Sequence, residues 1–415
     1  MNNKTITLIE YEYLHYNEND NEKTKLSLKE FNAVKEFIYR NEETNATQFL
    51  KITTRNKHEA LEAQQFVGII QLTNGKTIEI LPKISKEKNV EKSKEILIKM
   101  LKTLKNFPFK NFQSVNLKTT KMPLFEIFIQ MFLVELWKVV KKGVKHNYIT
   151  IEENAKFLKG KLIFPQHIKK NFAHRERFFI SYDNYLPDRI ENRIIKTTLK
   201  FLYKLSSETA NKKMIRSLLF IFDEITPITN NIKNAFSKIK LDRTIDYYQT
   251  VLMWCKVFLL HENFTPYKGK DIAFALLFDM NRLFESYVGK WFKDNCKNFV
   301  VSLQESKHYL IDKPRKFHLR PDIVLRDNDK VIVLDTKWKV IKEEREIADE
   351  DIYQMFAYAS KYNNEYEKCE EIYLIYPAIE EKRDFQNFEF KICKNNVKLG
   401  IRFFDVIKKI KKINP

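Results

Sequence analysis

Length, composition and charge narrow the class of protein before any motif is considered. The chain has 415 residues, of which 44% are hydrophobic and 13% aromatic, so it can form two or three folded domains and is not intrinsically disordered. Its formal charge of +20 favours a polyanionic partner such as nucleic acid, although a generally lysine-rich composition would raise the charge equally. The four cysteines form no C-x-x-C pair, which argues against zinc sites and disulfides and favours a reducing, cytoplasmic location.

Residues 1–118 have the pattern of a β-rich module. Two segments with strand character, Phe66–Thr73 and Lys76–Leu81, flank Asn74-Gly75, the preferred dipeptide of a two-residue hairpin turn. Asn74-Gly-Lys-Thr77 resembles the end of a phosphate-binding P-loop, but Ile70 occupies the place of the required first glycine and no helix follows. We therefore expect no nucleotide-binding site in this chain.

Residues 119–262 are expected to be a helical middle region. The apolar run from Met122 to Val140 contains charged residues at helical spacing, which predicts a core helix and not a membrane span. Apolar residues recur every three or four positions in four segments: Met122–Lys141, Asp188–Leu205, Lys212–Phe222 and Thr244–Leu260.

Residues 263–415 change pattern again and predict a mixed α/β domain. The order is helix, three strands, helix and more strand (α-β-β-β-α-β), which describes a small mixed sheet flanked by helices. The expected elements are a helix at Ile272–Phe292, strands at Phe299–Leu303, Phe317–Arg326 and Val331–Lys339, a helix at Asp349–Tyr362, strands at Glu371–Tyr376 and Phe385–Cys393, and a last helix from about Phe403.

The second and third of these strands predict a cluster of charged side chains. A hairpin turn centred on Asn328-Asp329 pairs Arg326 with Val331, and counting back along both strands places Asp322 opposite Asp335. Directly opposed residues share one face of a sheet with Cβ atoms about 5 Å apart. Lys337 lies two residues beyond Asp335 and therefore on the same face.

This arrangement suits the hydrolysis of phosphodiesters. Two carboxylates so close together repel each other unless a proton or a cation neutralises them. Mg²⁺, for which Mn²⁺ can substitute, prefers one or two carboxylates together with water and phosphate oxygens. We therefore expect Asp322 and Asp335 to bind the metal ion, and Lys337 to position or activate the attacking water. The alternative is a solvated hairpin whose charged side chains form cross-strand ion pairs.

Pro321-Asp322, twelve intervening residues and then Asp335-Thr-Lys337 resemble the PD-(D/E)xK nuclease superfamily. That resemblance implies a further metal-site acid at Glu285 on the preceding helix. It also implies that Gln354 and Tyr358, four residues apart on one helical face, support the site or contact DNA, as the Q-x-x-x-Y element of RecB-like nucleases does. Glu285 could equally be a solvated acid, and Gln354 and Tyr358 an ordinary helix surface.

The chain more specifically resembles the McrC family, the nuclease subunits of McrBC-type (type IV, modification-dependent) restriction systems. The segments that carry this likeness are Gly68–Leu72, Ile78–Ile84, Leu158–Leu162, Glu191–Lys196, Leu283–Glu285 and Leu334–Lys339. The resemblance implies an endonuclease that cuts DNA in antiviral defence, driven by an McrB-like AAA+ GTPase that contacts the N-terminal region. Double-strand cleavage would need two nuclease subunits.

Other interpretations remain open from the sequence alone. The chain could be a nuclease of the same superfamily that acts without a motor in repair or transposition, or a regulatory scaffold that stimulates a AAA+ motor while cleavage is secondary. His308 and His318 lie near the site in sequence, but neither has a partner at metal-ligand spacing, so core or surface roles are expected. The basic segment Lys408–Lys412 is either a solvated helix face or a contact to DNA phosphates.

Overall fold

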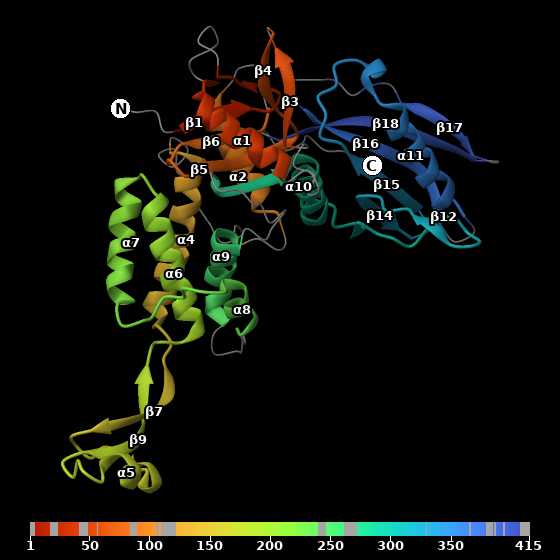
Figure 1. The fold of residues 1–415 in the computed structure, drawn as a ribbon. Helices are drawn as coiled ribbons and strands as arrows, with labels where there is room; N and C mark the ends of the chain where they lie inside the picture. The colour runs from red at the N-terminus through yellow and green to blue at the C-terminus, as the bar shows by residue number, and fades with distance from the viewer. Residues whose placement is uncertain are drawn as a thin grey trace. The chain divides into compact units, whose positions relative to one another are not determined.

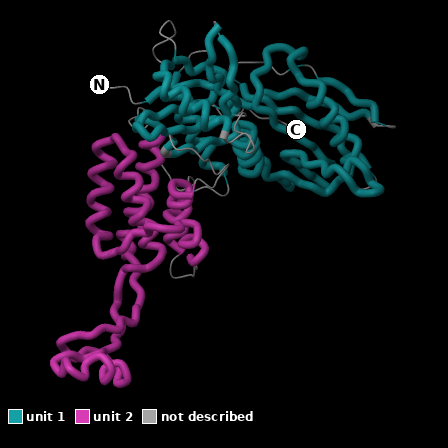
Figure 2. Tube along the Cα trace, in the orientation of Figure 1, with its two compact units in different colours: residues 1–124, 267–415 teal, residues 125–266 magenta. Residues whose placement is uncertain are grey.

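The computed structural model divides the chain into two compact units (Figures 1 and 2). Unit 1 comprises residues 1–124 and 267–415, and unit 2 comprises residues 125–266. The regions predicted at the two ends of the chain therefore belong to one unit. The structure describes residues 5–16, 24–40, 49–55, 57–83, 89–104, 108, 122–239, 246–260, 272–328, 330–364, 367–378, 385, 387–392 and 395–406. The basic segment Lys408–Lys412 lies outside these residues.

The N-terminal part of unit 1 contains the predicted hairpin. Strands β5 and β6 pair antiparallel from Gly68↔Ile80 to Gln71↔Thr77, and Gly75 takes a positive φ of 84° in the turn between them. The hairpin is confirmed, and with it the conclusion that this segment is not a P-loop. The first sheet has the order β1-β6-β5-β10 and consists of β1 (Thr5–Ile9), β6 (Thr77–Leu81), β5 (Phe66–Leu72) and β10 (Ile272–Asp279). The remaining elements here are β2 (Tyr13–Leu14), α1 (Leu28–Arg40), β3 (Leu50–Arg55), β4 (His58–Ala63) and α2 (Val90–Leu101).

Strand β10 corrects the prediction of one long helix at Ile272–Phe292. The chain is extended over Ile272–Asp279, where it pairs antiparallel with β5, and only then forms helix α10 (Met280–Asn295). A short, wholly apolar run has no period that separates a buried strand from a buried helix, so the pattern was ambiguous. Gly68 makes this pairing possible, because a Cβ atom at that position would lie 2.0 Å from the carbonyl oxygen of Leu276.

A six-stranded sheet forms the C-terminal part of unit 1. Its order is β11-β14-β15-β16-β18-β17, with β15, β16 and β18 parallel to one another. The strands are β11 (Val300–Leu303), β14 (Ile323–Asp327), β15 (Lys330–Thr336), β16 (Lys368–Ala378), β17 (Phe388–Ile392) and β18 (Asn395–Asp405). Helices α10 and α11 (Asp349–Lys361) pack against the sheet, and β12 (Tyr309–Ile311) and β13 (Lys316–His318) form a separate hairpin.

The prediction of a final helix from about Phe403 is wrong over the described residues. Phe403 lies in β18, where it pairs with Tyr376 of β16. An interior strand is covered on both sides by other strands and by side chains, so its apolar residues need not alternate and can imitate a helical spacing. The observed elements form a mixed α/β, multidomain protein, as the sequence predicted.

Unit 2 is largely helical, as expected. Its helices are α4 (Leu124–Lys142), α6 (Ile190–Leu205), α7 (Thr209–Ile221), α8 (Ile232–Ser237) and α9 (Gln249–Leu260). Aromatic rings of α4 and α9 pack in its core, with Phe132 and Phe258 centroids 5.8 Å apart. None of the helices in the described ranges is long and apolar enough to cross a membrane.

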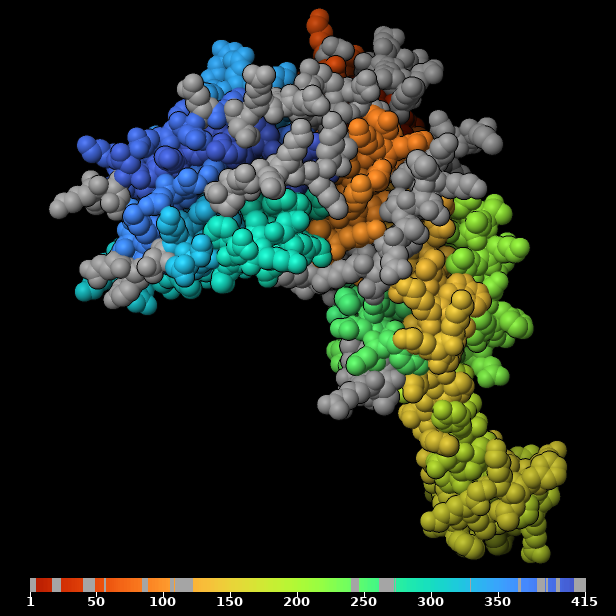
Figure 3. Space-filling view, turned by 180° about the vertical axis from the view of Figure 1, so that it is seen from behind, coloured from red at the N-terminus to blue at the C-terminus, as the bar shows by residue number. Residues whose placement is uncertain are grey.

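Unit 2 also contains a small lobe that the helical periodicity did not reveal. The lobe consists of the three-stranded sheet β7-β9-β8 and helix α5, which Figures 1 and 3 show at the end of the helices of this unit. Its elements are β7 (Asn147–Ala155), β8 (Lys161–Leu162), α5 (Phe164–Asn171) and β9 (Phe178–Leu186). Several of its apolar side chains are exposed to solvent, among them Phe157 at 82% and Phe172 at 85%.

A buried carboxylate joins two helices of unit 2. Glu126 of α4 is only 2% exposed and accepts hydrogen bonds from the chain at the start of α7. The donors are the Ser207 backbone N–H at 2.6 Å, the Ser206 hydroxyl at 2.8 Å and the Asn211 amide at 2.7 Å. A negative charge is also favourable at the positive end of a helix dipole.

We expect Glu126→Leu to lower the free energy of unfolding of unit 2 by about 2–4 kcal/mol, because it leaves several buried donors without an acceptor. Urea denaturation followed by circular dichroism measures this change. Glu176→Leu in the same unit is the control, since Glu176 and its ion-pair partner Arg177 are both exposed, and exposed ion pairs contribute about 1 kcal/mol or less. An equal loss in both variants would contradict the role given to Glu126.

Candidate active site

The β14–β15 hairpin brings the two predicted carboxylates to adjacent strands. The register pairs Arg326 with Val331 and Ile323 with Leu334, which confirms the pairing expected from the turn. Asp322 directly precedes β14, and its Oδ2 accepts hydrogen bonds from Thr336 N at 2.7 Å and Thr336 Oγ1 at 2.6 Å. Thr336 adjoins Asp335, which is 2% exposed at the end of the interior strand β15. The sheet therefore fixes both acids where the strands end.

Lys337 connects these acids to helix α11. Its Nζ lies 2.9 Å from Asp335 Oδ2 and donates a hydrogen bond of 2.8 Å to Gln354 Oε1. The amide of Gln354 in turn donates to the Tyr358 hydroxyl at 2.7 Å. The structure thus brings all three predicted catalytic residues and both predicted supporting residues into one continuous set of contacts.

Asp351 belongs to the same set and was not singled out from the sequence. Its Oδ1 lies 3.6 Å from Lys337 Nζ, and its Oδ2 accepts a hydrogen bond of 3.3 Å from the Tyr376 hydroxyl. The available signal was its place three residues before Gln354, which puts both side chains on one face of α11. An acid in the first turn of a helix is so common that the spacing alone did not distinguish it.

Glu285 approaches the site from α10 and is held by residues of a neighbouring loop. It accepts a hydrogen bond from the Gln304 amide, whose carbonyl oxygen accepts one from Arg320 at 2.5 Å. Gln304 also donates its backbone N–H to the carbonyl oxygen of Asp322 at 2.9 Å. Arg320 directly precedes the Pro-Asp motif, but nothing in the sequence marked Gln304.

Burial and mutual repulsion dominate the electrostatics of the three acids. Burial, followed by the nearby charge of Asp322, raises the pKa of Asp335 from 3.8 to about 7. Burial and the charge of Glu285 raise the pKa of Asp322 to about 6, and burial and Asp335 also raise the pKa of Glu285. The charged form of each acid is therefore destabilised in the protein without a bound cation.

Lys337 remains a cation in these surroundings. Its burial opposes the charge, but Asp335 and Asp351 outweigh that effect and raise the pKa of the ammonium. Among the described residues, no three acidic, histidine or cysteine side chains lie close enough together to form a preformed metal cage. The pair of Asp322 and Asp335 is therefore the candidate cation site, with Glu285 at its edge.

Both histidines near the motif in sequence lie outside this set of contacts. The His308 ring packs against Tyr362 with centroids 4.4 Å apart, and its Nε2 lies 3.4 Å from Glu367. The His318 ring packs against Tyr309 in the β12–β13 hairpin, with centroids 4.1 Å apart. Their contacts are those of packing and surface residues, as expected.

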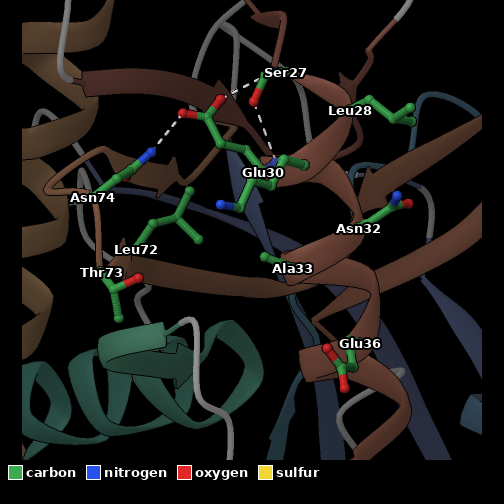
Figure 4. Close-up of a pocket in the computed structure, with 10 residues that line it drawn as sticks. Ser27, Leu28, Glu30, Asn32, Ala33, Glu36, Leu72, Thr73 and Asn74 are labelled. Carbon is green, nitrogen blue, oxygen red and sulfur yellow. Dashed lines mark hydrogen bonds between the residues drawn. The ribbon is translucent and has the colours of Figure 1, made fainter.

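A separate cavity of about 770 Å³ lies in the N-terminal part of unit 1 (Figure 4). It is lined by the first turns of α1 and by the β5–β6 turn, and it contains none of the predicted catalytic residues. The carboxylate of Glu30 in its wall accepts hydrogen bonds of 2.7 Å from Asn74 and 2.7 Å from Lys76. These contacts hold the hairpin turn against α1.

A family model described as "McrBC 5-methylcytosine restriction system component" matches residues 61–377. The chain belongs to the McrBC family. This match includes the β14–β15 hairpin, α11 and most of the N-terminal sheet, and it confirms the family expected from the sequence.

One curated protein and two solved structures are similar to this chain. The type IV methyl-directed restriction enzyme EcoKMcrBC of Escherichia coli K12 is 22% identical in an alignment of 278 residues that covers 62% of this chain and 79% of that protein. A chain in the assembly of Thermococcus gammatolerans McrB AAA+ hexamers with bound McrC superposes with a TM-score of 0.72 at 20% identity, covering 98% of this McrBC-family chain and 97% of the other. A chain of the T. gammatolerans McrBC complex gives a TM-score of 0.52 at 21% identity over 71% and 89% of the two chains.

Proposed function

We propose that this McrBC-family chain is an McrC-type subunit with a PD-(D/E)xK nuclease domain, and that it hydrolyses DNA phosphodiesters with Mg²⁺. The observation that carries the proposal is the linked arrangement of Asp322, Asp335 and Lys337 at the ends of adjacent strands, with Gln354 orienting the lysine. Its place of action would be the cytoplasm, where foreign DNA enters the cell.

The residues present fit a Mg²⁺ ion. Asp322 and Asp335 supply carboxylate oxygens, and Mg²⁺ usually takes one or two of these together with water and phosphate oxygens. Asp335 Oδ2 is buried and, within the described residues, accepts no well-aligned hydrogen bond beyond its ion pair with Lys337. A cation between the two acids would remove the repulsion that raises their pKa values. Mn²⁺ binds the same kinds of oxygen ligand and is expected to replace Mg²⁺ at this site.

Each residue of the site then has a distinct task. When bound, the metal ion would lower the pKa of a coordinated water and offset the charge of the scissile phosphate. Asp322, fixed by Thr336, and Asp335 would hold the ion, with Glu285 as an outer acid. Lys337 is protonated, so it would position the water by hydrogen bonding and stabilise the negative charge of the transition state. Gln354 and Tyr358 would keep the ammonium aimed at that position.

We further propose that an McrB-like AAA+ GTPase drives this subunit, and that two subunits combine to cut both strands. The T. gammatolerans structure contains McrB AAA+ hexamers with bound McrC, and its fold covers nearly the whole of this chain. Residues 1–118 are the proposed motor-binding region. The lobe of unit 2 is a second candidate surface, because exposed apolar side chains such as Phe157 and Phe172 favour contact with a protein.

The test is cleavage of plasmid DNA with and without 5-methylcytosine, by the wild type with Mg²⁺, in the presence and absence of the cognate AAA+ GTPase and GTP. Cleavage that requires the partner and GTP would support both proposals. Cleavage without the partner would retain the nuclease and reject the dependence on a motor. Stimulation of the GTPase without cleavage under any condition would reject the nuclease and favour a regulatory scaffold.

The raised pKa values also predict how metal binding depends on pH. Asp322 and Asp335 release their protons at higher pH in the folded protein than in the unfolded chain, so the metal-free protein loses stability as pH rises from about 4 to about 7. Mg²⁺ binds the ionised pair, so we expect it to raise the melting temperature clearly at pH 8 and little at pH 5. Thermal unfolding at both pH values measures this difference, and an equal effect of Mg²⁺ in Asp335→Ala would contradict the assignment.

A further inference from the structure

A buried contact joins the N-terminal sheet to the residue that follows the candidate catalytic lysine. Glu10, which directly follows β1, is 2% exposed, and Trp338 is 4% exposed. The indole Nε1 of Trp338 donates to both carboxylate oxygens of Glu10, at 3.0 and 3.1 Å. The two residues are 328 positions apart in the sequence. The proposed reaction does not use this carboxylate.

Glu10 is itself firmly held in the N-terminal sheet. Its backbone N–H donates to the carbonyl oxygen of Leu81 at 3.0 Å, and its Oε2 accepts the backbone N–H of Lys83 at 2.8 Å. Burial raises the pKa of this carboxyl to about 8. A buried acid is costly in a fold unless it is hydrogen-bonded, and the donors here are the Lys83 backbone N–H and the Trp338 indole.

The chain next to Trp338 is fixed from a second direction. The backbone N–H of Lys337 continues the hydrogen bonding of the sheet and donates to the carbonyl oxygen of Ile375 at 2.9 Å. The backbone N–H of Trp338 instead donates to the side-chain oxygen of Asn281 at 3.2 Å. The Asn281 amide also donates to Gln65, which lies between β4 and β5, at 3.0 Å. The N-terminal sheet therefore contacts both Trp338 and its partner on α10.

Asn281 and Glu285 are one helical turn apart on α10, so a single face of this helix meets the catalytic strand. The indole of Trp338 packs against Phe284 of the same helix, with ring centroids 5.3 Å apart. The contacts of Trp338 thus fix the position of the chain at the end of β15 relative to the start of α10. The direction of the Lys337 side chain depends on the backbone at this point.

We propose that Glu10 is a positioning residue for the nuclease reaction, which acts through Trp338 to hold Lys337 in its catalytic place. This inference rests on the proposed nuclease function. It makes the N-terminal sheet a structural part of the active site, in addition to any contact with a partner. Displacement of a reacting group by about 1 Å can cost about 100-fold in rate.

The test compares Glu10→Ala, Glu10→Gln and Trp338→Phe with the wild type, as full-length chains with the motor partner, GTP and Mg²⁺. Glutamine can still accept the indole hydrogen bond, whereas alanine cannot. We expect Glu10→Ala and Trp338→Phe to lower kcat about 10- to 100-fold with an unchanged KM for DNA. Glu10→Gln should stay within about threefold of the wild type.

The matched control is Glu79→Gln in the same sheet. Glu79 is also fully buried, but its carboxylate contacts Lys94 at 2.9 Å, the Leu124 backbone N–H and the Thr7 hydroxyl, none of which belongs to the proposed site. A loss of kcat in Glu79→Gln as large as that in Glu10→Ala would overturn the inference, because it would reflect stability of the sheet alone. A wild-type kcat in Glu10→Ala would also overturn it.

Hydrogen exchange provides a measurement that does not depend on cleavage. We expect faster amide exchange in the peptide spanning residues 335–341 of Glu10→Ala, and wild-type exchange there in Glu79→Gln. Unchanged exchange in Glu10→Ala would refute the positioning role even if the wild type is active. Faster exchange together with an inactive wild type would instead retain the contact and reject the proposed nuclease function.

Discussion

Asp335→Asn is expected to abolish DNA cleavage while making the metal-free protein more stable. The substitution removes a proposed metal ligand, for which we expect a rate loss of about 1000-fold or more. The same carboxylate is buried beside Asp322, and its pKa is raised, so its charge destabilises the fold above neutral pH. A neutral amide of the same shape relieves this repulsion. We therefore expect the melting temperature at pH 8 without metal to rise by about 2–4 °C.

Plasmid cleavage and thermal unfolding of the same protein preparation measure both effects. Asp327→Asn is the matched control, because Asp327 is an exposed aspartate at the other end of the same hairpin. We expect this control to cut DNA at the wild-type rate with an unchanged melting temperature. A destabilised Asp335→Asn protein would show that the carboxylate serves the fold, and the site would lose its main support.

Lys337→Met is expected to separate metal binding from catalysis. The substitution removes the ammonium that contacts Asp335 and Gln354, while both proposed metal ligands remain. Without this neighbouring positive charge the two acids should bind Mg²⁺ at least as tightly at pH 8 as in the wild type. Cleavage should fall about 100- to 1000-fold, because the water and the transition-state charge lose their cationic partner.

Isothermal titration with Mg²⁺ and single-turnover cleavage distinguish these two effects. Lys339→Met is the control, since Lys339 is exposed and its ammonium donates to the carbonyl oxygen of Glu346 at 2.6 Å. We expect it to retain both metal binding and cleavage. Loss of Mg²⁺ binding in Lys337→Met would mean that the lysine organises the acids, and its proposed role in the reaction would have to be abandoned.

The candidate site was predictable because its geometry depends on local rules. A two-residue turn fixes the register of a hairpin, and the register fixes which side chains share a face. The sequence therefore predicted that Asp322 and Asp335 lie on neighbouring strands with Lys337 beside them. Gln354 and Tyr358 were expected from the resemblance to the Q-x-x-x-Y element of RecB-like nucleases, and their four-residue spacing places both on one helical face.

The remaining parts of the site depend on contacts that no local pattern encodes. Gln304, which contacts Glu285, takes a positive φ of 48° directly after β11, a conformation that no local pattern in the sequence predicts. Glu10 contacts Trp338 across 328 positions of sequence, a separation that no local pattern covers. Two strands were also mistaken for helices, since buried apolar runs have no distinguishing period. Packing between segments far apart in the sequence determines these contacts and the extended conformation of these strands.

Strand β10 gives the chain an unusual covalent order. Three strands of the first sheet, β1, β5 and β6, precede unit 2 in the sequence. Its edge strand β10 follows unit 2. Unit 2 is therefore an insertion within a domain whose two halves are joined by strand pairing. Replacement of unit 2 as a whole would therefore leave the strand pairing of unit 1, and with it the framework of the candidate site, in place.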